Sequence, residues 1–465
     1  MEYLIRLAQV HETFRKPELE ALATLHGIDV QFVYYDEQSP FCIVKLQNEA
    51  SAARLISRSI LTKGIYEFWG YGTTYEELHA DVRARTSHLW EKFRNCSFRF
   101  AFDTYMGKRD SKEKTSIIQS FSYLDFQGPI KMNHPDEEFM IFEEYEKLVD
   151  TNSTTGVPPP SKLRKLYFAR FIANGSREAP DRYDLKKRNY ISTTSMDAEL
   201  TLITANMALA APGKLFYDPF VGTGSFCVAM AHFGAHTLGS DIDGRSFRGA
   251  GKQRHKLEAK APASPIGLVS NLQQYGLEGR FIECFTSDLT NTPLLTGRPF
   301  LDGIICDPPY GIREGLKVLG YRDGGKREPV VVDGTPTHYM DGYVPPKKPY
   351  SFDFMIDDIL QFAAMSLVPE GRISFWMPTA NEEDVELEIP SNPNLELVSV
   401  CVQTFNKWSR RLLTYKRTHS ELIVVERTMQ SKNASADELN PFRKHYFSPT
   451  SSASKEKRQP GSQGH

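Results

Sequence analysis

The sequence has few cysteines, no long apolar run and no excess of charge of either sign. Its six cysteines in 465 residues form no Cys-x-x-Cys pair or other spacing typical of a metal site. The 56 basic and 58 acidic residues nearly balance, so any surface for a polyanion has to be a local patch. The sequence contains no run of about eighteen apolar residues, which a membrane-spanning helix would need. The first residues also lack the pattern of a secretion signal. We expect a cytoplasmic protein that has inert buried thiols, binds no metal and does not contact a membrane.

The apolar content is sufficient for more than one core, because 40% of the residues are hydrophobic and 12% are aromatic. Residues 1–72 show the order strand, helix, strand, strand, helix, strand, which is typical of a ferredoxin-like domain. Residues 73–160 alternate helical and strand-like runs, which indicates a second small α+β domain that ends in a linker rich in Thr, Gly and Pro.

Residues 161–427 follow a different pattern, in which short apolar runs are separated mostly by helical segments. This alternation predicts an α/β fold with a doubly wound, mainly parallel sheet. A stretch without periodicity, 313–350, interrupts it and reads as a long loop, which in a compact domain is usually functional or disordered. Residues 428–465 have the composition of a disordered tail. The predicted strands are 215–217, 237–239, 281–285, 303–306, 373–377, 398–402 and 422–425.

A glycine-rich turn follows the first of these strands, in the segment KLFYDPFVGTGS. Asp218 ends the strand, and Gly222 and Gly224 let the backbone approach a ligand in front of a helix N-terminus. Cys227 stands where the dinucleotide-binding fingerprint would need a third glycine, which makes a nicotinamide enzyme less probable. Taken alone, the turn is equally compatible with a tight connection.

Two further aspartates follow later strands. Asp241 lies about 20 residues beyond the glycine turn, where an acidic side chain commonly accepts hydrogen bonds from ribose hydroxyls. Asp288 ends another strand and is placed to accept from an adenine amino group. Each has a structural alternative: Asp241 begins a possible turn, and a Ser-Asp pair at a strand end is an ordinary helix cap.

The most specific motif is Asp307-Pro308-Pro309-Tyr310, directly after the strand 303–306. The prolines stiffen the backbone and present two fixed acceptors, the Asp307 carboxylate and the Pro308 carbonyl oxygen. Fixed acceptors suit an aromatic amine, whose hydrogens must be held while its lone pair faces an electrophile. Tyr310 offers a planar surface on which a base can stack. We therefore expect a methyltransferase that acts on an exocyclic amine of a nucleobase.

The motifs resemble a known family. DPFVGTGS, GSDID, SDLT and DPPYGIREG, together with RNYISTTSMDAELTLITANMA and WSRRLLTYKR, are similar to the eukaryotic tRNA guanosine N2-methyltransferases that act at position 10. The resemblance implies that residues 73–160 are a THUMP domain that grips tRNA and that residues 161–427 are a Rossmann-like methyltransferase domain that binds S-adenosyl-L-methionine. The same resemblance implies a small zinc-binding activator subunit. It also implies the site residues. Ser195, Asp218, Gly222, Gly224, Asp241 and Asp288 would hold the cofactor, and Asp307, Pro308 and Tyr310 would hold the guanine.

Basic residues cluster in two places, each with aromatic residues between them. Residues 161–190 carry nine Lys or Arg against three Asp or Glu, and 405–418 carry five basic residues and no acidic one. We expect phosphate contacts from Arg188, Lys407, Arg410 and Arg411, and the alternative is a solvated charged face. Two other functions stay open: an amino-methyltransferase for rRNA or DNA, and a non-catalytic RNA-binding scaffold.

Overall fold

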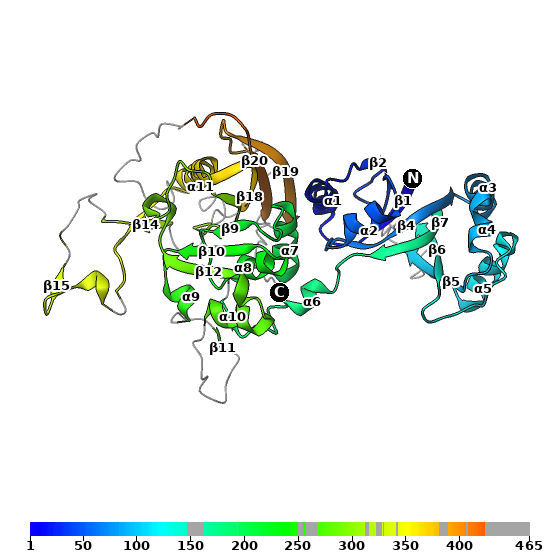
Figure 1. Cartoon of the computed structure of the whole chain (residues 1–465), viewed down its shortest axis with the longest axis horizontal. Helices are drawn as coiled ribbons and strands as arrows, with labels where there is room; N and C mark the ends of the chain where they lie inside the picture. Colours follow the sequence, from blue (N-terminus) through cyan, green and yellow to red (C-terminus); the bar gives the residue numbers. More distant parts are fainter. Residues whose placement is uncertain are drawn as a thin grey trace, which may run out of the picture. The chain divides into compact units, whose positions relative to one another are not determined.

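The computed structural model describes residues 1–146, 162–192, 194–249, 254–255, 267–311, 316–321, 328, 330–340, 343–380, 389–405 and 408–423. Contacts between Cα atoms divide the chain into two units, one mainly of Met1–Pro212 and one mainly of the residues from Gly213 onward. Figure 1 shows the elements of each unit. Among the described residues, no helix is long and apolar enough to cross a membrane.

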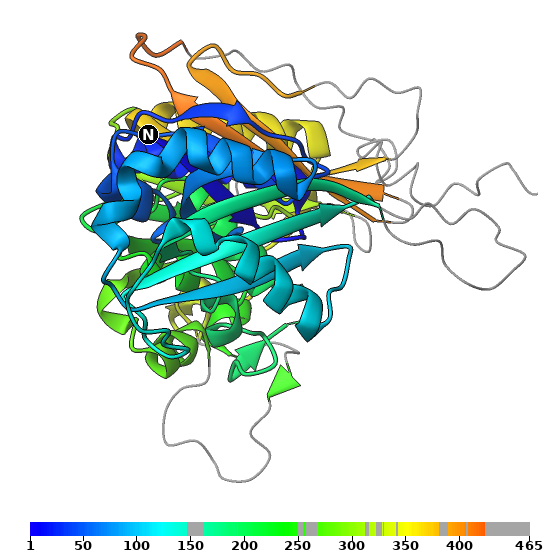
Figure 2. The same ribbon diagram turned by 90° about the vertical axis from the view of Figure 1, so that its right-hand side faces the viewer.

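The first unit is built on a seven-stranded sheet in the order β2-β3-β1-β4-β7-β6-β5. Figure 2 shows its blue and cyan strands side by side, with helices packed against them. The predicted ferredoxin-like order of residues 1–72 is confirmed by β1, α1, β2, β3, α2 and β4. The strands are β1 (Glu2–Leu7), β2 (Gln31–Tyr34), β3 (Phe41–Lys45), β4 (Thr62–Gly72), β5 (Phe98–Tyr105), β6 (Glu137–Tyr145) and β7 (Leu163–Asn174). The helices are α1 (Glu12–His26), α2 (Glu49–Ile56), α3 (Tyr75–Thr86), α4 (Trp90–Phe93), α5 (Ser111–Ser120), α6 (Ala179–Arg182) and α7 (Ala198–Met207).

This sheet is strongly curved. β1 and β5 are separated by three strands, which in a flat sheet would place them about 19 Å apart. Yet Arg6 of β1 contacts Asp103 of β5, with Nε 2.6 Å from Oδ2, and the Arg6 guanidinium lies over the rings of Phe41 and Tyr105. The concave face is therefore filled by its own side chains.

The expected boundary at residue 160 is wrong for one strand. We expected Leu163–Asn174 in the methyltransferase domain, but this strand, β7, is hydrogen-bonded between β4 and β6. The two expected small domains, 1–72 and 73–160, consequently share one continuous sheet that needs β7 to join them. The sequence analysis assigned no strand to these residues, and a local pattern does not show which strands pair with one another.

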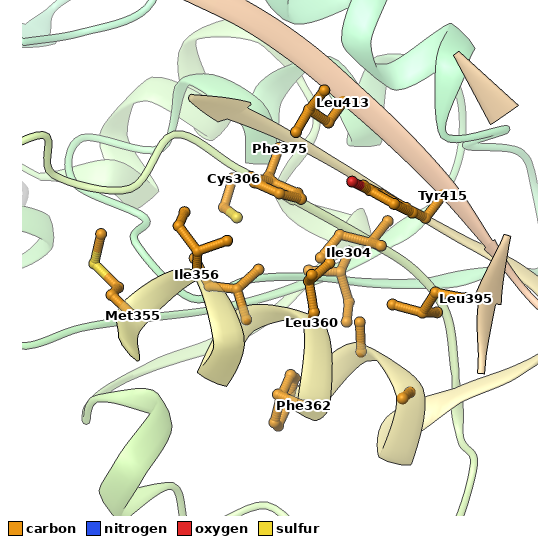
Figure 3. Close-up of a cluster of buried hydrophobic side chains, with 14 of the residues drawn as sticks. Ile304, Cys306, Met355, Ile356, Leu360, Phe362, Phe375, Leu395, Leu413 and Tyr415 are labelled. Atoms are coloured by element: carbon orange, nitrogen blue, oxygen red, sulfur yellow. The ribbon is translucent and has the colours of Figure 1, made fainter. Parts of the chain in front are cut away.

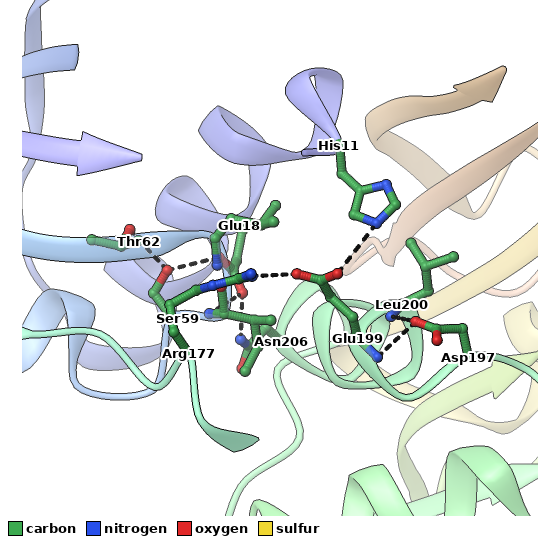
Figure 4. Close-up of polar contacts among 11 residues, drawn as sticks. His11, Glu18, Ser59, Thr62, Arg177, Asp197, Glu199, Leu200 and Asn206 are labelled. Atoms are coloured by element: carbon green, nitrogen blue, oxygen red, sulfur yellow. Dashed lines mark hydrogen bonds and ion pairs between the residues drawn. The ribbon is translucent and has the colours of Figure 1, made fainter. Parts of the chain in front are cut away.

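A buried polar network joins α1 and α7 within the first unit (Figure 4). The Glu18 carboxylate is fully buried and accepts hydrogen bonds from the Ser59 hydroxyl, the backbone N–H groups of Ile60 and Leu61, and the Asn206 side-chain amide. Arg58 in turn donates to the Asn206 carbonyl oxygen at 2.8 Å. Burial raises the pKa of Glu18, because these donors only partly replace the water that the carboxylate has lost.

The second unit contains the predicted α/β sheet, in the order β12-β10-β9-β13-β18-β20-β19. The first five strands are parallel, and β20 pairs antiparallel with both β18 and β19. The strands are β9 (Leu215–Asp218), β10 (His236–Asp241), β12 (Phe281–Thr286), β13 (Leu301–Cys306), β18 (Leu367–Ala380), β19 (Leu395–Thr404) and β20 (Trp408–Arg417). The helices after β9 are α8 (Ser225–His232), α9 (Arg245–Arg248), α10 (Leu268–Tyr275) and α11 (Phe352–Ser366).

The core of this sheet lies under α11 (Figure 3). Ile356 and Leu360 of the helix pack with Ile304 of β13 and with Phe375 of β18, all at most 4% exposed. Apolar residues at positions i and i+4 of α11 form the stripe that faces the strands. This packing holds the strand ends, and the loops that follow them, in fixed positions.

Three details of the second half differ from the prediction. Trp408–Arg417, which we read as a basic motif, forms the long strand β20. The sequence predicts a strand at 422–425. Leu422 and Ile423 form no strand, and residues 424–425 lie outside the described residues. The loop expected at 313–350 contains, where described, the short strands β14 (Lys317–Leu319), β15 (Val331–Val332), β16 (Thr335–Pro336) and β17 (Lys347–Pro349). The expected tail, 428–465, lies outside the described residues.

Candidate active site

The strand order places two of the predicted aspartates on either side of a switch point. From β9 the chain passes to β10 on one side, whereas β13 pairs with β9 on the other side. Ligands of open α/β sheets bind beyond the carboxyl ends of the strands at such a point. Asp218 ends β9 and Asp307 directly follows β13, so the two residues lie at the carboxyl ends of adjacent strands, on either side of this point.

Asp218 is the most deeply buried of the site carboxylates, with 1% of its surface exposed. Its Oδ1 accepts a hydrogen bond from the Phe220 N–H at 3.0 Å, whereas Oδ2 has no partner among the described residues. Burial raises the pKa of Asp218 well above its usual value, and the charges of Asp241 and Asp307 raise it further. An unpartnered buried oxygen costs free energy unless a ligand supplies a donor.

The glycine turn has the backbone geometry that the motif predicts. Gly222 and Gly224 adopt φ values of 50° and 83°, in the left-handed region that favours glycine. A Cβ atom on Gly224 would lie 2.5 Å from the Leu268 side chain, so no larger residue fits there. The close approach of backbone and α10 therefore requires this glycine.

Asp241, at the end of β10, holds the glycine turn from below. Its Oδ2 accepts from the Gly222 N–H at 3.0 Å, and its Oδ1 accepts from the Asp243 N–H at 2.8 Å. Burial raises the pKa of Asp241, and these two backbone donors oppose the rise. Each oxygen accepts one of these two hydrogen bonds and keeps a second lone pair, so the carboxylate can still accept from a ligand hydroxyl.

Asp288 serves as a cap, which was the alternative to its expected cofactor contact. Its Oδ1 accepts from the N–H groups of Thr290 and Asn291 and from the Thr290 hydroxyl. Its Oδ2 accepts from the Leu319 N–H at 2.5 Å and from the Asn291 amide at 3.2 Å. With these bonds made, little acceptor capacity is left for an adenine amine. In this conformation Asp288 joins the end of β12 to β14.

Asp307 and Tyr310 of the Asp-Pro-Pro-Tyr motif contact each other. The Tyr310 hydroxyl donates to Asp307 Oδ1 at 2.5 Å. Burial raises the pKa of Asp307 to about 6, against the opposing effects of this hydrogen bond and of the positive charge of Arg410. Pro308 is buried and holds the backbone between them. With this pKa the carboxylate is mostly ionised at neutral pH. Since Tyr310 bonds to Oδ1, Oδ2 is left as an acceptor for a ligand.

Aromatic and basic side chains of β20 and its neighbours lie beside this pair. The Trp408 ring meets Tyr310 edge-on with centroids 6.1 Å apart, and stacks on Phe405 at 4.7 Å. The Arg410 guanidinium lies over the rings of Trp376 and Phe405, at 4.7 and 5.6 Å. Sequence reasoning missed Trp376 and Phe405. A strand reading of Trp408–Arg417 would have placed Trp408 and Arg410 on one face, because side chains two residues apart share a face.

The remaining predicted residues have different surroundings. In the first unit, the Ser195 hydroxyl accepts from the Ser192 N–H at 2.9 Å and is partly exposed. Arg188 is 1% exposed, so its side chain is buried in this conformation, and its expected RNA contact stays a prediction. Arg411 is partly exposed on β20, and Lys407 lies outside the described residues. No group of three metal-ligating side chains occurs among the residues that the structure describes.

Comparison with known proteins defines the class. The family model "Tmrp11 THUMP N-terminal domain" matches residues 1–177, and "RMKL-like, methyltransferase domain" matches residues 186–319. The chain is thus a THUMP-containing methyltransferase, with its Asp-Pro-Pro-Tyr motif inside the methyltransferase match. The solved structure of TrmN from Thermus thermophilus is similar with a TM-score of 0.41 and 15% identity, covering 90% of this chain and 100% of that chain.

Curated relatives define the family. The chain is 44% identical to the tRNA (guanine(10)-N(2))-methyltransferase of Saccharomyces cerevisiae, over 89% of this chain and 92% of the relative. It is 37% identical to the Schizosaccharomyces pombe enzyme, with 97% of each chain covered, and 34% identical to the Homo sapiens enzyme, with 96% and 95% covered. The chain belongs to the tRNA (guanine(10)-N(2))-methyltransferase family.

Proposed function

We propose that this chain is the catalytic subunit that transfers a methyl group from S-adenosyl-L-methionine to the N2 amine of the guanosine at position 10 of tRNA. Membership of the family supports the substrate. The single observation that supports the chemistry is the pair Asp307 and Tyr310, held at the carboxyl end of β13 beside the switch point.

Asp307 would act on the guanine amine. Delocalisation of the lone pair into the ring makes this amine a poor nucleophile, so its orientation matters most. The Asp307 carboxylate and the Pro308 carbonyl oxygen would each accept a hydrogen bond from one N–H group of this amine. These two bonds would orient the lone pair toward the methyl donor. As positive charge develops on N2, the carboxylate stabilises it more than it stabilises the neutral amine, and later accepts the proton.

The glycine turn and two aspartates fit the cofactor. When bound, S-adenosyl-L-methionine supplies an electrophilic methyl group. Oδ2 of Asp218 is buried without a partner among the described residues and would accept from a donor group of that ligand. Asp241 would accept from ribose hydroxyls, and the turn at Gly222 and Gly224 would let the ligand approach the backbone. Ser195 remains a proposed contact; Asp288 is better explained as a cap.

The decisive experiment compares wild-type chain with Asp307→Asn on tRNA, in the presence of the activator subunit and cofactor. The amide keeps the shape but loses the charge and the proton acceptor, so N2-methylguanosine formation at position 10 should fall by about 100-fold or more. Cofactor binding by calorimetry should persist. Glu278→Gln, an exposed change in the same unit, should leave both unchanged. Equal methylation by Asp307→Asn would rule out this mechanism.

A small zinc-binding activator subunit remains a proposal. An activator must influence the site, and β12 is an edge strand that leads directly to Asp288. Its Ile282 is 53% exposed, and an open strand edge can pair with another chain. Ile282→Glu should prevent co-purification with the subunit. Val398→Glu, on the opposite edge strand β19, should not. Loss of binding with Val398→Glu alone would place the partner elsewhere.

The other candidate functions make different predictions. An rRNA or DNA amino-methyltransferase would leave guanosine 10 of tRNA methylated in cells that lack this chain, and a scaffold would bind no cofactor. A cytoplasmic location is likewise a proposal, in keeping with six cysteines that form no disulfide in the structure.

A further inference from the structure

We propose that Arg410 is a positioning residue of the methyl-transfer site: it fixes the Tyr310 hydroxyl and, through it, the carboxylate of Asp307. This inference rests on the proposed function and adds a role for β20 within it. Sequence reasoning assigned Arg410 to RNA phosphate, but its contacts point inward to the Asp-Pro-Pro-Tyr motif.

Arg410 is held in place by residues of two neighbouring strands and by Phe405. Its Nε donates to Gln403 Oε1 at 2.6 Å, across the antiparallel pair of β20 and β19, where these two residues are direct partners. The guanidinium lies over Trp376 of β18 and over Phe405. Trp376 is fully buried, so its ring has a fixed position on which the planar guanidinium can stack.

Arg410 in turn interacts with Tyr310. The Tyr310 hydroxyl accepts a hydrogen bond from Arg410 while it donates its own hydrogen to Asp307 Oδ1 at 2.5 Å. The three side chains thus form a chain of hydrogen bonds, guanidinium to hydroxyl to carboxylate. Trp408 adds an edge-on contact to the Tyr310 ring. A tyrosine held at its hydroxyl and at its ring keeps one orientation, and so does the carboxylate that it bonds.

Arg410 also contributes positive charge near Asp307. Among the described residues, the titratable groups that interact electrostatically with Asp307 include Tyr310 on its own loop, Cys306 at the end of β13, Asp218 at the end of β9 and Arg410 on β20. Among them Arg410 is the cation, and it lowers the pKa of Asp307 against burial. Without Arg410, only the Tyr310 hydrogen bond would oppose the effect of burial, and the pKa of Asp307 would rise.

A phosphate-binding arginine and a positioning arginine differ in what their loss changes. Loss of a phosphate contact weakens tRNA binding at every pH and reduces its salt dependence. Loss of a positioning contact leaves tRNA binding intact, lowers the rate of transfer and moves the acidic limb of the rate. The two roles can therefore be separated in one variant.

The test uses the full chain with the activator subunit, in the form that methylates tRNA, and compares wild type, Arg410→Met, Arg410→Lys and Lys416→Met. Arg410→Met should lower the single-turnover rate by about 10- to 100-fold and move the acidic midpoint up by about one pH unit. Filter binding of tRNA should change less than about threefold. Arg410→Lys should restore the midpoint, because the charge returns, but only part of the rate, because lysine lacks the planar fork.

Lys416→Met is the control, because it removes a cation from the same face of β20, where Lys416 pairs with Glu370 and Glu396. It should behave as wild type. The inference is overturned if Arg410→Met weakens tRNA binding at an unmoved midpoint, or changes nothing. If wild-type chain fails to methylate tRNA, the proposed function fails instead. The inference is then judged by tryptophan fluorescence, whose pH midpoint must move in Arg410→Met and not in Lys416→Met.

Discussion

The carboxylate of Asp288 holds the backbone of Leu319, with Oδ2 2.5 Å from the amide nitrogen, and so ties the end of β12 to β14. The same side chain caps the turn at Thr290 and Asn291. An aspartate whose position suggests a ligand contact is here engaged by the protein itself. The strand β14, which follows the Asp-Pro-Pro-Tyr motif in the sequence, is thereby attached to the end of β12.

Asp288→Ala should therefore destabilise the second unit more than it weakens cofactor binding. The change removes a cap and a buried acceptor, each worth about 1 kcal/mol or more. Urea unfolding should show a lower midpoint, while Glu278→Ala, at an exposed position, should stay within about 0.5 kcal/mol of wild type. Unchanged stability with a large loss of cofactor affinity would restore Asp288 to the cofactor site.

Asp218→Asn should bind cofactor poorly yet fold at least as stably as wild type at neutral pH. The pKa of this buried acid is raised in the folded chain, so folding opposes its ionisation. This free-energy cost of folding is absent below the unfolded pKa near 4 and grows as the pH rises toward the folded pKa. At pH values above the folded pKa it is constant. The variant's stability relative to wild type should thus increase between pH 4 and neutrality. A variant destabilised at every pH would contradict this.

Methyl transfer should depend on pH through Asp307. The ionised carboxylate is the active form, and burial raises the pKa of this group to about 6. The single-turnover rate should accordingly fall tenfold per pH unit below about pH 6 and level off above it. Tyr310→Phe removes a hydrogen bond to the charged form, so the midpoint should move upward. A midpoint near pH 4 in both proteins would mean that Asp307 is not the titrating group.

Glu18 and Asn206 should be strongly coupled in the stability of the first unit. Glu18→Ala leaves Asn206 and two backbone N–H groups without their buried acceptor, which should cost about 3 kcal/mol. In a double-mutant cycle with Asn206→Ala, the coupling free energy should exceed about 0.5 kcal/mol. Glu20→Ala, at an exposed position of α1, provides the control. Additive effects would mean that the two residues act independently.

Local sequence pattern was sufficient for much of this protein. The order of strands and helices in residues 1–72, the doubly wound sheet and the Asp-Pro-Pro-Tyr motif after β13 all follow from periodicity and turn chemistry, because these depend on neighbours within a few residues. Motif spacing likewise predicted that Asp218, Asp241 and Asp307 end or follow parallel strands.

Contacts between residues far apart in the sequence could not be predicted from the local pattern. That β7 joins β4 to β6, that Arg410 reaches Tyr310 rather than solvent, and that Asp288 bonds Leu319 all depend on which segments the folded chain brings together. Hydrogen bonds and burial between residues so far apart arise from packing of whole elements, which no local window contains.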